Sequence, residues 1–121
     1  MMKYKIPALD TTEACRTPYA ELGVHRMVAK AYFFSDMADN ELINFDDYIY
    51  DEDVSGIIGE CRKQKIREFT VSSTYSGMVR IIARFVEIGC TLEGMVTVND
   101  SYRDPLSGER RTLPAFKLSV D

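Results

Sequence analysis

The spacing of apolar residues in the second half of the chain predicts three strands and one helix. Residues 66–72 and 112–120 alternate between apolar and polar positions, as strands with one buried face do, and residues 91–99 are also interpreted as a strand. Residues 75–88 place their apolar side chains on one side of a helix, opposite a polar face. The order is therefore β-α-β-β, and a right-handed crossover would make the first two strands parallel neighbours or place them on either side of the third.

Turn residues set the expected boundaries of these elements. Ser73-Thr74 is typical of a helix N-cap, and Gly89 is typical of a helix end. Asn99 to Arg111 is polar and contains two turn signals, so we expect a long loop between the last two strands.

The first half of the chain favours helices. Apolar spacing predicts one long helix over about residues 18–38, with His25 in its middle, and a second helix over about residues 53–64. Thr11-Thr12-Glu13 is typical of a further helix start. Residues 3–9 alternate weakly and predict either a short edge strand or an extended lead.

These elements predict an α+β fold in a single domain spanning residues 1–121. Residues 1–64 would be mainly helical, and residues 65–121 would form β-α-β-β, a small three-stranded sheet packed on one helix. The length of 121 residues fits one domain, and an apolar content of 45% is typical of a globular protein.

Cysteine usage and the N-terminal sequence indicate a cytoplasmic protein. Cys15, Cys61 and Cys90 are widely separated and odd in number, which argues against a disulfide framework or a zinc ribbon. Cys61 and Cys90 lie in apolar stretches, where we expect buried reduced thiols. No hydrophobic signal core and no membrane-length run is present, so we expect no membrane association.

Charge is distributed unevenly along the chain. Residues 31–61 contain nine carboxylates and no Lys, Arg or His, whereas the remaining residues contain 10 acids and 15 Lys or Arg. The formal net charge of −4 therefore conceals a polarised molecule. Polarisation of this kind governs partners and association rates rather than fold.

Within the acidic stretch, carboxylates alternate with aromatic side chains. Such a segment could imitate the phosphates and bases of a nucleic acid and bind a basic groove. The competing interpretation is a solvated acidic face, or one paired internally with the basic residues of 62–67 and 103–111. The candidate partner-binding residues are Asp46, Asp47, Tyr48, Tyr50, Asp51, Glu52 and Asp53.

A second candidate site is the hydroxyl-rich turn at residues 72–77. Ser73, Thr74 and Ser76 could help backbone N–H groups to hold an anion at a helix start. The turn lacks the lysine-containing pattern of a nucleotide-binding loop, and N-capping alone explains these hydroxyls. We therefore weigh the anion site against a purely structural role.

Calcium binding and catalysis have little support in the sequence. Residues 51–62 partly match a calcium-binding loop, but Arg62 stands where a bidentate Glu is required. His25 has no evident nucleophile or metal-ligand partner, and nothing selects one pair of carboxylates for acid–base chemistry. We expect no metal, no cofactor and no enzymatic activity.

The run EFTVSSTYSGMVRIIARFVEIGCTLEGMVTVN (68–99), with Gly108-Glu109-Arg110 and Pro114-Ala115-Phe116-Lys117-Leu118, resembles a group of small uncharacterised bacterial proteins. Proteins of this group are often carried on mobile elements. The resemblance covers roughly the last 55 residues. It implies a compact α+β module from a prokaryote or phage, and it transfers no functional residue.

The functional hypothesis is a non-enzymatic interaction protein. Its acidic segment would mimic nucleic acid and engage the basic surface of a protein partner. The protein would thereby inhibit or regulate a nucleic-acid-handling protein without itself binding nucleic acid directly. The alternatives are a homo-oligomeric structural module, or a small domain that binds an anion or another ligand at residues 72–77.

Overall fold

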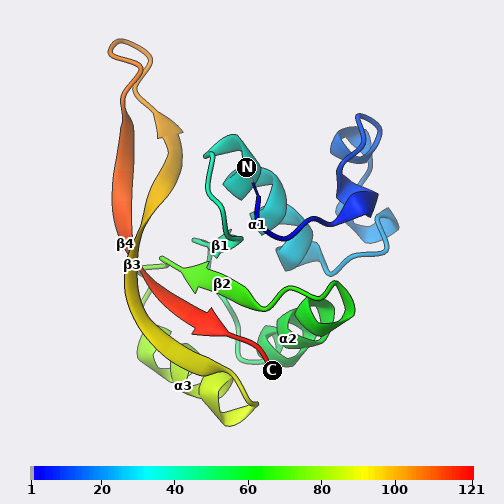
Figure 1. Cartoon of the computed structure of the whole chain (residues 1–121), viewed down its shortest axis with the longest axis vertical. Coiled ribbons are helices and arrows are strands. Elements are labelled where there is room, and N and C mark those ends of the chain that lie inside the picture. The colour runs from blue at the N-terminus through cyan, green and yellow to red at the C-terminus, as the bar shows by residue number, and fades with distance from the viewer. Residues whose placement is uncertain (1) are drawn as a thin grey trace.

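The computed structural model describes residues 2–121, and in this range the chain forms three α-helices and a four-stranded sheet (Figure 1). The α+β class is confirmed. Short 3-10 turns occur at Pro7–Leu9, Ala14–Arg16 and Tyr19–Glu21. In chain order, the helices and strands are α1 (Arg26–Met37), β1 (Asn44–Phe45), α2 (Asp53–Lys63), β2 (Glu68–Val71), α3 (Met78–Glu87), β3 (Thr91–Arg103) and β4 (Arg110–Ser119).

The sheet has the strand order β1-β2-β4-β3. β2 and β3 flank β4 and are both antiparallel to it, as one of the predicted arrangements requires. β1 adds a fourth strand, parallel to β2, that the sequence did not predict. Because β1 has only two residues, it contains no alternation to detect. β1, α2 and β2 together form a parallel β-α-β unit.

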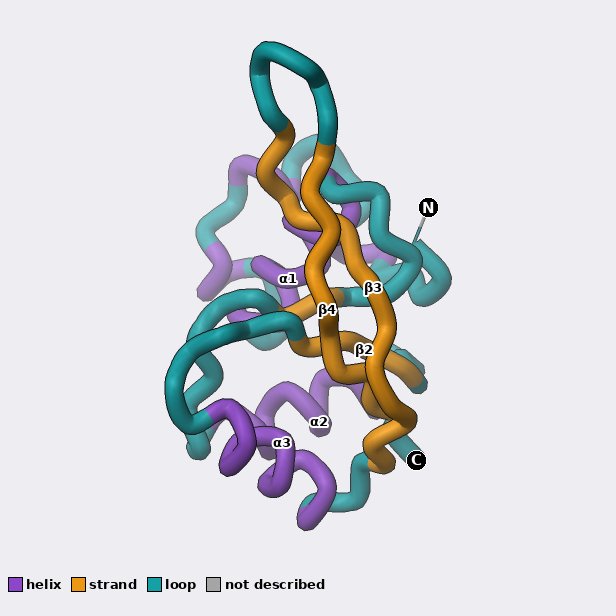
Figure 2. The backbone as a smooth tube through the Cα atoms, turned by 90° about the vertical axis from the view of Figure 1, so that its left-hand side faces the viewer, coloured by secondary structure: helices purple, strands orange, loops and turns teal. Residues whose placement is uncertain are grey.

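The hairpin of β3 and β4 extends well beyond the rest of the molecule (Figure 2). The predicted loop from Asn99 to Arg111 is too long, because β3 continues to Arg103 and β4 begins at Arg110; the turn between them contains both predicted turn signals. Both faces of this part of the hairpin are largely exposed. An alternation of apolar and polar residues is not required where neither face is buried, so the sequence pattern did not reveal the outer residues of the two strands.

The predicted long helix over 18–38 is also wrong in its first part. α1 begins at Arg26, and His25 is its N-cap rather than a mid-helix residue: its Nδ1 accepts a hydrogen bond from the Met27 N–H at 3.2 Å. Gly23 has φ +72°, a conformation that interrupts a helix. Residues 3–9 form no strand of the sheet and contain the turn at Pro7–Leu9.

α3 begins later than predicted. Its N-cap is Gly77, which has φ +85°, and no side chain caps the helix, so the assignment of Ser73-Thr74 as the N-cap is wrong. The hydroxyls of residues 73 and 74 lie too far before Met78 to reach the orphan N–H groups of the first turn. The predicted helix end at Gly89 is close to the observed last residue, Glu87.

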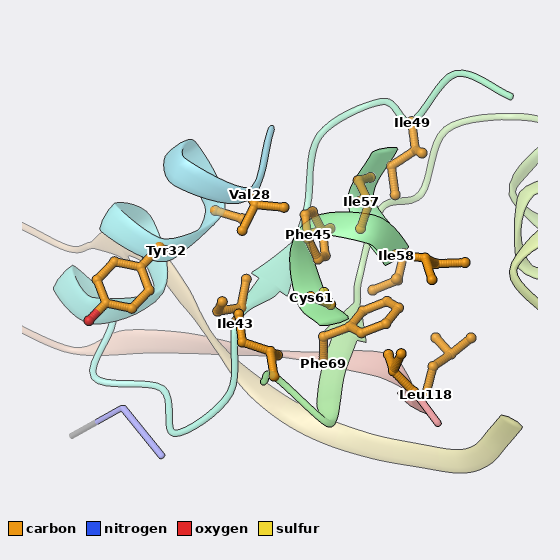
Figure 3. Close-up of a cluster of buried hydrophobic side chains, with 14 of the residues drawn as sticks. Val28, Tyr32, Ile43, Phe45, Ile49, Ile57, Ile58, Cys61, Phe69 and Leu118 are labelled. Atoms are coloured by element: carbon orange, nitrogen blue, oxygen red, sulfur yellow. The ribbon is translucent and has the colours of Figure 1, made fainter. Parts of the chain in front are cut away.

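The core lies between the sheet and the helices (Figure 3). Phe69 of β2 is fully buried, and its ring contacts Phe45 of β1 at 5.5 Å and Phe85 of α3 at 5.3 Å between centroids. α1 contributes Val28 and Tyr32, and β4 contributes Leu118. These contacts hold the ends of β1 and β2 in fixed positions, and the candidate site begins there.

Candidate functional site: an acidic and aromatic surface

The candidate site lies where β1 and β2 end. The two strands are parallel, so the segments that leave their carboxyl ends emerge at the same edge of the sheet. One segment is residues 46–52 and the other is residues 72–77. Crevices at this edge are the usual binding position in parallel sheets, because loops converge there. We call residues 46–53 together with Tyr75 the acidic–aromatic surface.

Three tyrosines from these segments form one exposed cluster. Tyr48 and Tyr50 have ring centroids 4.6 Å apart, and Tyr48 lies 5.6 Å from Tyr75. The exposed fractions are 39% for Tyr48, 56% for Tyr50 and 52% for Tyr75. Ile49 lies between the first two in sequence but is buried, so it anchors the segment while both tyrosines face solvent. This arrangement requires an extended conformation at residues 48–50.

A cavity of about 430 Å³ opens beside the cluster. α1 supplies one wall, and the acidic–aromatic surface supplies the other. The cavity combines aromatic faces with charges of both signs. Its lining residues are Tyr19, Arg26, Met27, Lys30, Asp47, Tyr48, Tyr50 and Asp53.

Two carboxylates of the surface are paired with cations of the same chain. Lys30 Nζ donates to Asp47 Oδ2 at 2.7 Å, and Arg84 Nε lies 3.8 Å from Asp51 Oδ1. The hydrogen bond from Lys30 holds the pKa of Asp47 below its usual value, and the bond from the Tyr48 N–H reinforces this effect. The internal pairing that the sequence suggested does occur, but with helices α1 and α3 rather than with residues 62–67 or 103–111.

The other acids of the surface are less neutralised. Within residues 2–121, Asp46 and Glu52 form no ion pair, and both side chains are exposed. Local desolvation nevertheless raises the pKa of Asp46, and the neighbouring charge of Asp47 adds to the rise. Asp53 Oδ2 accepts a hydrogen bond from the Tyr50 N–H at 3.3 Å and thereby fixes the turn before α2.

A buried polar network holds the base of the site. Asn44 Nδ2 donates to Ser72 Oγ at 2.8 Å, and Thr70 Oγ1 donates to Asn44 Oδ1 at 2.8 Å. The Asn44 N–H donates to Ser35 Oγ of α1, also at 2.8 Å. This asparagine therefore connects α1, β1 and the end of β2, and it sets the spacing of the two segments that carry the tyrosines.

The structure brings four of the predicted partner-binding residues to one cavity, namely Asp47, Tyr48, Tyr50 and Asp53. The remaining three are Asp46, Asp51 and Glu52, and they belong to the same segment without lining that cavity. Sequence reasoning missed the residues that come from other elements. These are Tyr19, Arg26, Lys30, Tyr75 and Arg84.

The residues predicted for anion binding do not form one exposed group. Ser73 is buried, and its Oγ has no hydrogen-bond partner within residues 2–121. Thr74 and Ser76 are exposed and lie before the Gly77 cap. An anion site at this turn stays a prediction.

Residues 2–121 contain no cluster of His, Cys, Asp and Glu side chains that could hold a metal ion. Residues 53–62, which would form most of a calcium loop, are helical in α2. None of the described helices is both long and apolar enough to cross a bilayer.

The fold and the site define a small α+β domain with a parallel β-α-β unit, an acidic–aromatic surface and a protruding hairpin. The chain belongs to the family described as "Domain of unknown function (DUF7698)", which matches residues 27–120. The match extends well beyond the last 55 or so residues that carried the resemblance in the sequence. Neither a curated protein nor a solved structure matches the chain.

Proposed function

We propose that this domain is a non-enzymatic interaction module that binds the basic surface of a protein partner through its acidic–aromatic surface. The observation that carries the proposal is the exposed cluster of Tyr48, Tyr50 and Tyr75 among carboxylates. Exposed tyrosines that contact one another are rigid and amphipathic, so they provide contact area at little entropic cost on binding.

The chemistry of the cluster favours a partner rich in Arg or Lys. A guanidinium or ammonium group can lie on a tyrosine ring while a neighbouring carboxylate accepts its hydrogen bonds. Asp46 and Glu52 are the acids best placed for this role, because Asp47 and Asp51 already have cationic neighbours. Complementary charge also accelerates association and makes it sensitive to salt.

Nucleic-acid-handling proteins carry basic surfaces of this kind. On such a partner, the carboxylates would take the positions of phosphates and the tyrosines would take those of bases. We therefore place the domain among inhibitors or regulators of such proteins, and we propose a prokaryotic or mobile-element source and a cytoplasmic location.

Affinity capture from cells of the source organism, at low and at high salt, tests this proposal. We expect the domain to retain a basic protein at low salt and to release it at high salt. A variant with the five acids of the surface replaced by amides should lose that protein. The five replacements are Asp46→Asn, Asp47→Asn, Asp51→Asn, Glu52→Gln and Asp53→Asn.

A matched control removes the same charge elsewhere. Its five replacements are Glu13→Gln, Glu21→Gln, Asp36→Asn, Glu41→Gln and Glu109→Gln, all at exposed positions. The control should retain the partner. Equal capture by the two variants, or capture that does not change with salt, would overturn the proposal.

A further inference from the structure

Four cations lie close together where α2 ends. Arg62 and Lys63 are the last two residues of the helix, and Lys65 and Arg67 follow it. All four side chains are exposed, and in the part of the chain that the structure describes none of them forms an ion pair. The attraction of cations to a helix C-terminus accounts for the first two. It does not account for Arg67, which lies four residues past the end of the helix.

Lys65 occupies a backbone position that favours glycine. Its N–H donates to the Arg62 carbonyl at 3.2 Å, and the Ile66 N–H donates to the Cys61 carbonyl at 2.8 Å. These two bonds define a Schellman ending of the helix, in which the residue at position 65 has a positive φ, here +58°. Glycine adopts this conformation without strain, whereas a residue with a Cβ does not. The chain therefore carries a cation where helix termination alone would select glycine.

Three of the four cations line one cavity of about 190 Å³. They are Arg62, Lys65 and Arg67. The fourth, Lys63, is held elsewhere, because its Nζ donates to the Gly23 carbonyl at 3.3 Å. The rest of the lining is mainly apolar and contains one carboxylate. These remaining residues are Cys61, Ile66, Val120 and Asp121.

The backbone around this basic cavity is fixed by hydrogen bonds. The Val120 N–H donates to the Arg67 carbonyl at 2.8 Å, which places the end of the chain beside α2 and the start of β2 (Figure 1). Gly89 leaves room for the side chain of Arg62, since a Cβ at this glycine would lie 3.4 Å from Arg62 Nη2. The cavity is therefore formed before any ligand binds, and this lowers the entropic cost of binding.

We propose that the basic cavity binds the phosphate end of a small phosphate monoester or diphosphate. Two guanidinium groups and one ammonium group together offer donors to every oxygen of a tetrahedral anion. A carboxylate has two oxygens, too few for all three cations. The cavity is smaller than the ~300–1,000 Å³ of sites that enclose a drug-sized ligand, so it fits a charged group rather than a whole molecule.

This site is separate from the acidic–aromatic surface. That surface ends at Asp53, the first residue of α2, whereas the basic cavity lies at the other end of the helix. The 11 residues of α2 span about 16 Å, so a small ligand in the cavity would not touch the tyrosines. A long nucleic acid is a poorer fit, because three cations neutralise few phosphates and the net charge of −4 repels the rest of the strand.

Titration with sodium pyrophosphate, followed by NMR of the backbone amides, tests the proposal. We expect saturable shifts at residues 61–67, 89–90 and 120–121, and little change at residues 46–53. Sodium chloride at the same ionic strength is the control and should not reproduce these shifts. A short oligothymidylate is the second probe, and it should bind more weakly than pyrophosphate.

Substitutions of both signs sharpen the test. Lys65→Gly removes a charge and relieves the backbone, so it should weaken pyrophosphate binding about fivefold while the melting temperature stays equal or rises. Arg67→Gln should weaken binding to a similar extent. Asp121→Asn removes the one carboxylate that lines the cavity and should strengthen binding. Arg80→Gln, at an exposed position of α3, is the matched control and should leave binding unchanged.

Three results would overturn the proposal. They are amide shifts no larger than those caused by sodium chloride, pyrophosphate binding that Lys65→Gly leaves unchanged, and tighter binding of the oligothymidylate than of pyrophosphate. Far-UV circular dichroism verifies the fold of each variant. Lys65→Asn provides a second neutral variant, because asparagine also tolerates a positive φ.

Discussion

The side chain of Asn40 pairs with the backbone of Asn99 as a neighbouring strand would. Its Oδ1 accepts from the Asn99 N–H at 2.9 Å, and its Nδ2 donates to the Asn99 carbonyl at 3.0 Å. Asn99 Nδ2 in turn donates to the Ala38 carbonyl at 3.0 Å. The two asparagines therefore fasten the protruding hairpin to the loop that joins α1 and β1.

We expect Asn40→Ala to destabilise the protein by about 1–3 kcal/mol, because it leaves the N–H and carbonyl of Asn99 unpaired. Asn40→Asp keeps the acceptor but sets a carboxylate oxygen against the Asn99 carbonyl, so it should also destabilise the protein. Urea unfolding gives the free-energy changes, and amide hydrogen exchange at Asn99 reports the local loss. Unchanged exchange at Asn99 in Asn40→Ala would contradict the role of this pair.

The two glycines within α2 should respond oppositely to alanine. A Cβ on Gly56 would lie 2.7 Å from Nε2 of His25, the residue that caps α1, so Gly56→Ala should destabilise by about 1–3 kcal/mol through overpacking. A Cβ on Gly59 meets nothing within 4 Å, so Gly59→Ala should stabilise the helix by about 0.5–1 kcal/mol. Thermal unfolding of both variants checks the signs, and a neutral Gly56→Ala would show that His25 moves freely.

The sequence predicted the elements whose apolar and polar residues are regularly spaced. α3 has one face toward the core, and in β2 the apolar Phe69 and Val71 alternate with polar residues, so their spacing revealed both elements. β1 was missed because Asn44 and Phe45 are both buried and too few to alternate. The outer part of the hairpin was missed for the opposite reason, because little of it is buried.

Only the part of the candidate site that is continuous in sequence could be predicted. Tyr48 and Tyr50 flank a buried isoleucine, and their segment is continuous in sequence. Tyr75 joins them through the parallel pairing of β1 with β2, and Lys30 joins through the packing of α1. Contacts of this kind depend on topology and register, which local periodicity does not specify.

Glu68 should make stability depend on pH in the acidic range. Its carboxylate accepts hydrogen bonds from Lys3 Nζ at 2.8 Å and from the Tyr4 hydroxyl at 3.0 Å, and Lys117 Nζ lies 3.3 Å away. The hydrogen bond from Lys3 is the main cause that lowers its pKa to about 2. Because the folded pKa is depressed, the stabilisation is complete above the ordinary carboxyl value of 4.5 and is lost as pH falls toward about 2.

The variant Glu68→Gln isolates this contribution. At neutral pH we expect it to be less stable than the unmodified chain by at most about 1 kcal/mol, because solvent screens the pairs. The difference should shrink as pH is lowered stepwise to about 3. Glu13→Gln, at an exposed position, is the control and should show no such trend. Urea unfolding at each pH measures the difference, and a constant gap between the two proteins would refute the assignment.

The three cysteine thiols should differ in reactivity, with one reacting fast and two reacting slowly. Cys15 is exposed, whereas Cys61 and Cys90 are buried. Burial raises the pKa of Cys61 to about 12 and that of Cys90 to about 11, so neither forms an appreciable thiolate at neutral pH. A chromogenic disulfide reagent should therefore react quickly with one thiol of the native protein and with the other two only on unfolding. Cys15→Ser should abolish the fast phase, whereas Cys61→Ser should leave it intact. If a second thiol of the native protein reacted fast, one of the two buried cysteines would be opening readily to solvent.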